Sequence, residues 1–88
     1  MALDSFAEEM RAAGYPVTEW GNGPGDHYDA HSHPYKKILC CLEGSIVFHT
    51  ADGDTSLAPG QRMVIELGVD HAATVGPTGV HCAEAHVS

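Results

Sequence analysis

The chain has 88 residues, of which 43% are hydrophobic, and a formal net charge of −8 with neutral histidines. A chain of this length forms one domain with a thin core that buries roughly 60–65% of the unfolded surface, which favours a homodimer. The acidity argues against nucleic acid and anionic membranes as partners, because both would repel it. Neither a bilayer-spanning apolar run nor a signal-peptide layout is present, so we expect a cytoplasmic protein.

The first predicted element is a short amphipathic helix over Leu3–Ala13. Ser5 and Glu8 have the spacing of a capping box. Gly14 stands where a glycine commonly ends a helix. This pattern predicts a helix packed on the domain, without chemistry of its own.

Beyond Gly14, short runs of β-branched and aromatic residues alternate with turn residues, which is typical of a sandwich or barrel. The short connections predict that neighbouring strands mostly pair antiparallel. Turns are expected at Glu43-Gly44, at Asp52-Gly53 and over Gly76–Gly79. The predicted strands are Tyr15–Trp20, His27–His33, Lys36–Leu42, Ile46–Thr50, Asp54–Leu57, Arg62–Glu66, His71–Val75 and Val80–His86.

The run Ile38–Leu42 is apolar at every position, so both of its faces must be covered, by a second sheet or by a partner chain. Cys40 and Cys41 lie in this run and point to opposite faces. With Cys82 they make an odd number of cysteines, which is no disulfide framework. We expect three reduced, buried thiols.

His31 and His33 are two residues apart, which places both imidazoles on one face of a strand and could offer two nitrogen ligands to one metal ion. The segment from Gly25 to Gly44 follows the first cupin motif, Gly-x5-His-x-His-x3-Glu-x6-Gly, with Lys37 in place of the glutamate. The segment from Gly60 to Val75 follows the second motif, Gly-x5-Pro-x-Gly-x2-His-x3-Asn, with Glu66 in place of the proline and Val75 in place of the asparagine.

In these motifs the chain resembles the cupin superfamily. The resemblance implies an all-β fold, namely a small antiparallel jelly-roll barrel over residues 15–87 with a short N-terminal helix over 3–13, in a single domain 1–88. It further implies that His31, His33 and His71 face the barrel interior and hold a divalent transition metal (Fe, Ni, Cu, Zn or Mn) with open coordination positions.

Lys37 stands where the family pattern has a carboxylate ligand. An ammonium has no lone pair and repels a metal ion. Three alternatives remain open: a three-histidine site with Lys37 turned aside and paired with an acidic residue, a deprotonated Lys37 that acts as base or ligand, or a site that has lost its metal.

Other residues are candidates for lining the same site. His27 has the parity of His31 and faces inward if no bulge intervenes, as a fourth ligand, a base or a rim histidine. Tyr35 could line the mouth, and Cys41 has the parity of Lys37. From the last strand, either Cys82 and His86 or His81 could reach the interior, and parity alone does not decide between them.

The function expected from these residues is that of a metal-binding cupin of unassigned substrate, with open positions for a small molecule or dioxygen. Any reaction would be dioxygenase-like or isomerase-like, and cupins that resemble thiol dioxygenases do have three-histidine sites. The alternative is a non-catalytic small-molecule-binding or regulatory cupin, possibly metal-free, because Lys37 could hold an acidic ligand.

Overall fold

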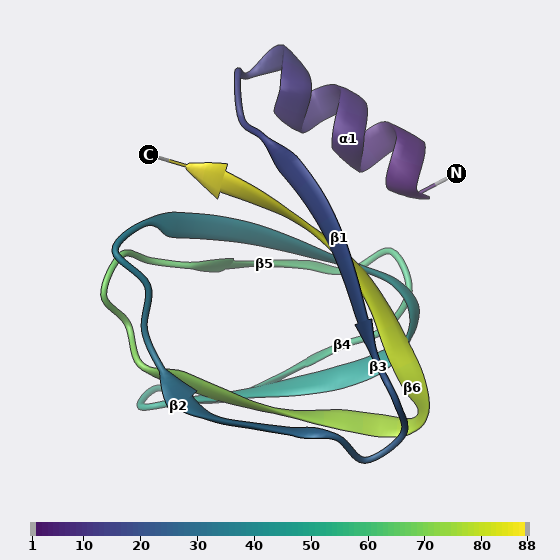
Figure 1. Ribbon diagram of the computed structural model, residues 1–88, viewed down its shortest axis with the longest axis vertical. Coiled ribbons are helices and arrows are strands. Elements are labelled where there is room, and N and C mark those ends of the chain that lie inside the picture. The colour runs from purple at the N-terminus through teal and green to yellow at the C-terminus, as the bar shows by residue number, and fades with distance from the viewer. Residues whose placement is uncertain (1, 88) are drawn as a thin grey trace.

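A computed structural model describes residues 2–87 and contains one helix and six strands (Figure 1). The elements are α1 (Ala2–Ala12), β1 (Val17–Asn22), β2 (His27–His31), β3 (Lys36–Thr50), β4 (Gly53–Leu57), β5 (Arg62–Ile65) and β6 (His71–Val87). All strand pairings within this range are antiparallel, as expected. Among the described strands, only β3 and β4 are partners that follow one another in sequence, contrary to the prediction that neighbouring strands mostly pair.

The two long strands, β3 and β6, pair along their length and belong to both layers of the barrel. The first half of β3 and the second half of β6 form one layer, in the order β1-β6-β3-β5. Their other halves form the second layer, in the order β2-β6-β3-β4. The layers lie face to face (Figure 1), which is the predicted all-β jelly-roll arrangement.

Eight short strands were predicted, and the structure merges four of them into β3 and β6. The expected turn at Glu43-Gly44 is instead a bend inside β3, flanked by register shifts. Gly44 has a φ of 74°, and a Cβ there would lie 1.9 Å from the carbonyl oxygen of Gly79 in β6. The two strands therefore bend together at a point where only glycine fits. The hairpin after β3 is tight, as predicted, but its loop residues are Ala51 and Asp52.

Helix α1 covers the outer face of the first layer (Figure 1). The buried side chains of Phe6 and Met10 pack on Cys40, Ala83 and Ala85. The outer face of the apolar run in β3 is thus covered by the helix, and not by a second sheet or a partner chain as predicted. The inner face of the run lies in the barrel core, where side chains of the second layer cover it.

The helix ends as predicted and begins earlier than predicted. The amides of Gly14 and Tyr15 donate to the carbonyls of Arg11 and Met10, which is the Schellman pattern of a glycine-capped helix. The helix already includes Ala2, so Ser5 lies inside it and the predicted capping box is wrong. Across the described residues, this helix is too short and too polar to cross a membrane.

The barrel interior is filled by apolar side chains from both layers. The buried ones are Leu39, Cys41, Ile46, Phe48, Leu57, Ile65, Ala73, Val75, Val80 and Cys82. All three cysteines are free and buried, as predicted. Burial raises the pKa of the Cys82 thiol to about 12, so this group stays protonated and packs as a small hydrophobe.

Candidate metal centre

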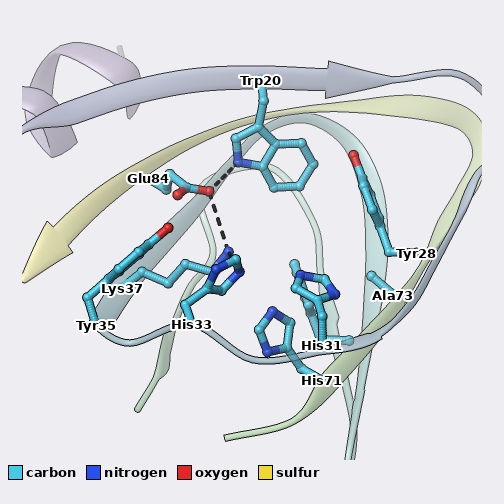
Figure 2. A pocket seen from close by; sticks show the side chains of 10 residues that line it. Trp20, Tyr28, His31, His33, Tyr35, Lys37, His71, Ala73 and Glu84 are labelled. Atoms are coloured by element: carbon cyan, nitrogen blue, oxygen red, sulfur yellow. Dashed lines mark hydrogen bonds and ion pairs between the residues drawn. The ribbon is translucent and has the colours of Figure 1, made fainter. Parts of the chain in front are cut away.

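Three histidines converge at the open side of the barrel (Figure 2). His31 is the last residue of β2, and His71 is its register partner at the start of β6. His33 lies two residues past His31, beyond the end of β2, where its carbonyl accepts a hydrogen bond from the amide of Gly68. One ligand nitrogen from each ring lies within 4.8 Å of those of the other two.

The hydrogen bonds of the three rings determine which nitrogen is free. The Nδ1 of His31 donates to the Asp29 carbonyl at 2.8 Å, and the Nδ1 of His71 donates to the Val69 carbonyl at 3.0 Å. In His33, the Nε2 accepts from the Lys37 ammonium at 3.4 Å, which requires a lone pair on that nitrogen. All three rings therefore carry their lone pair on Nε2, and in His31 and His71 a carbonyl orients the ring, as is common in metal-binding histidines.

His71 fits a metal most clearly. The residue is 2% exposed, and among the described side chains, those of residues 5–87, its Nε2 is the one buried nitrogen or oxygen that has no hydrogen-bond partner. A buried polar atom without a partner costs roughly 1–3 kcal/mol. Burial also lowers the pKa of His71 and of His33, and for His33 the Lys37 ammonium adds to the shift. Both rings are therefore held neutral, the form that binds metal.

Lys37 lies beside the three histidines and pairs with the carboxylate of Glu84. It is 7% exposed, and its Nζ lies 3.7 Å from Oε1 of Glu84, which is 8% exposed. The first of the three alternatives for Lys37 anticipated such an acidic partner. The ammonium also keeps its contact with His33, so it is shared between the carboxylate and the imidazole.

Glu84 is a site residue that the sequence analysis missed. Its Oε1 accepts a hydrogen bond from the indole N–H of Trp20 at 2.7 Å, and its Oε2 lies 2.6 Å from Nε2 of His86 (Figure 2 shows the first of these contacts). Glu84 has the same strand parity as Cys82 and His86. The sequence analysis left open whether that face of the last strand points inward, and this choice would have identified Glu84. His81 lies on the opposite face of β6 and pairs with Glu19 at 2.8 Å.

The histidines form one wall of a cavity of about 230 Å³ (Figure 2). Aromatic rings make up much of the remaining wall, with Trp20 and Tyr28 in an edge-to-face contact. The full lining consists of Trp20, Tyr28, His31, His33, Tyr35, Lys37, Phe48, His71, Ala73 and Glu84. Because His31 is exposed, the cavity is open to solvent beside the three rings.

Of the further candidates, the structure brings Tyr35 and Lys37 into the cavity but leaves out His27 and Cys41. Tyr35 stacks on the His33 ring, with centroids 5.1 Å apart. A register shift between Tyr28 and His31 supplies a bulge, so the condition under which His27 would face inward is not met. His27 therefore contacts Thr74 and Asp29 outside the cavity, while Cys41 is buried in the barrel core.

Comparison with solved structures finds proteins of similar fold. No protein-family model matches the chain, and a search of curated proteins finds no match. A cupin-2 domain protein from Shewanella frigidimarina is 18% identical, with a TM-score of 0.70 over 81% of this chain and 68% of that one. A protein of unknown function from Rhizobium leguminosarum is 15% identical, with a TM-score of 0.77 over 84% and 70%.

A third similar structure is the DMSP lyase DddQ from Ruegeria pomeroyi. It is 20% identical, with a TM-score of 0.78, and the match covers 84% of this chain but 38% of the lyase. At these identities the likeness concerns the fold. The chain has the cupin fold that its motif spacing predicted.

Proposed function

On the basis of this cupin fold, we propose that the chain binds one divalent transition metal through His31, His33 and His71 and presents it to a small molecule or dioxygen in the cavity. The observation that carries the proposal is the convergence of the three rings, each of which has a ligand nitrogen within 4.8 Å of those of the other two. Three protein ligands leave open positions, which distinguish a ligand-binding or catalytic metal from a structural one. Imidazole ligands suit Fe, Ni, Cu, Zn and Mn.

The charges around the site indicate which ligands it favours. Three neutral imidazoles leave a divalent ion with both of its charges, and the charges of Lys37 and Glu84 offset each other. A small anion would supply the missing negative charge in a cavity of low dielectric constant. Its apolar part would pack on Phe48, Ala73 and Trp20, within a volume of about 230 Å³. We therefore propose small organic acids as the ligand class.

Metal titration of the metal-free chain tests the proposal. We expect one equivalent of Zn²⁺ or Co²⁺ to bind per chain, and His71→Gln to weaken binding by at least about 100-fold because one of three ligands is lost. His49→Gln is the matched control, since this histidine pairs with Asp54 outside the cavity. Equal affinities of the two variants would contradict the proposed site.

A bound metal with open coordination positions would supply a Lewis acid or a binding site for dioxygen. Oxygen uptake and product analysis with small thiols, diketones and hydroxy acids separate a dioxygenase-like or isomerase-like enzyme from a binder. DMSP belongs in the same panel, because one structural neighbour is named a DMSP lyase. No turnover with any compound, together with saturable binding of an acid, would favour the non-catalytic function.

The alternative is a small-molecule-binding or regulatory protein that needs no metal. Lys37 favours it, because the ammonium already occupies the lone pair of His33. In that case the metal-free chain binds small acids with the affinity of the metal-loaded chain. A strict requirement for metal in acid binding would eliminate this alternative.

A further inference from the structure

The Lys37 ammonium contacts His33 and Glu84, and only the contact with His33 competes with a metal ion. Its Nζ lies 3.4 Å from Nε2 of His33 and 3.7 Å from Oε1 of Glu84. The lone pair of a ring nitrogen serves either a hydrogen bond or a metal, but not both. Metal binding at His33 therefore requires the ammonium to give up the imidazole and turn to the carboxylate.

Glu84 is held in place independently of Lys37. The Trp20 indole N–H donates to one carboxylate oxygen at 2.7 Å, and Nε2 of His86 lies 2.6 Å from the other. Tyr35 stacks on His86 with ring centroids 4.5 Å apart and thereby supports that contact. The carboxylate thus forms a fixed, nearly buried acceptor beside the lysine, and it needs no rearrangement to receive the full contact.

We infer that Glu84 is a positioning residue of the metal site: it draws the Lys37 ammonium away from His33 and offsets its charge, so that a metal can use the imidazole. This inference rests on the proposed function. Without the carboxylate, the buried ammonium keeps its hydrogen bond to His33 and repels an incoming cation at short range. In this role Glu84 acts through Lys37 and needs no contact with the metal.

A double-mutant cycle of Co²⁺ affinity tests the inference, with binding followed by visible absorption. Glu84→Gln removes the charge and keeps an oxygen for the Trp20 hydrogen bond, and we expect it to weaken Co²⁺ binding about 10- to 100-fold. Lys37→Met removes the ammonium, and we expect it to bind Co²⁺ at least as tightly as the wild type. In the Lys37→Met background, Glu84→Gln should change the affinity less than about threefold.

The matched control is Glu19→Gln, which removes an exposed carboxylate paired with His81 and should leave Co²⁺ affinity unchanged. Replacing both members of a buried ion pair by neutral groups is often neutral for folding, so the double variant reports even if Glu84→Gln alone folds poorly. An equal loss of affinity from Glu84→Gln in both backgrounds, no loss in either, or a weakened Lys37→Met variant would each overturn the inference. A wild-type chain that binds no Co²⁺ overturns the proposed function, and the inference with it.

Discussion

Lys37 is buried within hydrogen-bond distance of a nitrogen that the proposed metal needs. Replacing it with glutamate exchanges a repelling cation for a carboxylate ligand, so we expect Lys37→Glu to bind Zn²⁺ about tenfold more tightly or better. The same change sets two carboxylates against each other, because Glu84 faces this side chain. We expect the metal-free variant to lose about 1–3 kcal/mol of unfolding free energy.

Lys36→Glu is the matched control for this substitution. The adjacent lysine is 40% exposed and pairs with Glu66 at 3.7 Å, so the same charge change there should affect Zn²⁺ affinity little. Calorimetric titration measures the affinity, and urea denaturation the stability. Unchanged affinity of Lys37→Glu would mean that its side chain points away from the site in the metal-bound protein.

The lowered pKa values of His33 and His71 predict a pH dependence of stability. Burial is the first cause in both residues. Since an unfolded histidine has a pKa near 6.5, the unfolded chain takes up protons at a higher pH than the folded one. The contribution to stability is complete above about pH 6.5 and is lost as the pH falls through the lowered values of the folded state.

Thermal melts of the metal-free chain between pH 8 and pH 5 measure this dependence. We expect the melting temperature of the wild type to fall more steeply with decreasing pH than that of a His33→Gln/His71→Gln variant. Parallel profiles for the two proteins would show that these rings do not resist protonation in the folded state.

Individual residues were predictable where their spacing matches the cupin motifs, because the resemblance implies where those positions lie. His31, His33 and His71 come together because two short motifs keep their distances. Strict alternation places His27 inward only if no bulge intervenes, and a register shift before His31 supplies that bulge. Glu84 was missed because the direction of the last strand depends on its bend, which periodicity does not reveal.

Strands β3 and β6 span both layers because each bends without losing its partner. Gly44, at the bend of β3, has a positive φ. A Cβ at this position would lie 1.9 Å from the carbonyl oxygen of Gly79 and would overlap with it. We expect Gly44→Ala to lower the unfolding free energy by about 3 kcal/mol or more, from backbone strain and overlap together. Equilibrium denaturation in urea measures this loss.

Gly60→Ala separates the two contributions. This glycine also has a positive φ, of 88°, but a Cβ there meets no atom within 4 Å. Strain alone should cost about 1–2 kcal/mol. If both alanine variants lose the same stability, the close approach at the bend contributes nothing.

The elements themselves were largely predictable, and their continuity was not. Strand segments and their turn residues appear in the sequence as alternating runs and glycines. Whether Glu43-Gly44 ends a strand or bends it depends on pairing with His81 and Val80, which lie far away along the chain. For the same reason the sequence indicated that the apolar run in β3 needed a cover, but not that α1 provides it.

The molecule as a whole has a thin barrel core, and α1 covers one outer face of the barrel. Three large apolar side chains stay exposed on and just after β5: Val64 at 47%, Leu67 at 62% and Val69 at 39%. Strand β5 pairs only with β3 among the described strands, so one of its edges is open. We propose that the chain forms a homodimer, which would add apolar burial to a thin core.

Sedimentation equilibrium at micromolar concentration tests the dimer. We expect about twice the chain mass of 9.3 kDa, and a shift toward the monomer for Leu67→Lys. The control is Leu42→Lys, whose side chain packs against the apolar cluster under α1, so that the change should lower stability rather than alter the association. A wild-type monomer at these concentrations would contradict the proposal.

The central claim is that three imidazoles hold a divalent metal and leave it accessible. X-ray absorption of the Zn²⁺-loaded protein at the zinc edge tests it most directly. We predict three imidazole nitrogens at about 2.0–2.1 Å, with the remaining ligands light atoms from water or a bound acid. A shell with sulfur at about 2.3 Å, or with fewer than three imidazoles, would contradict the account.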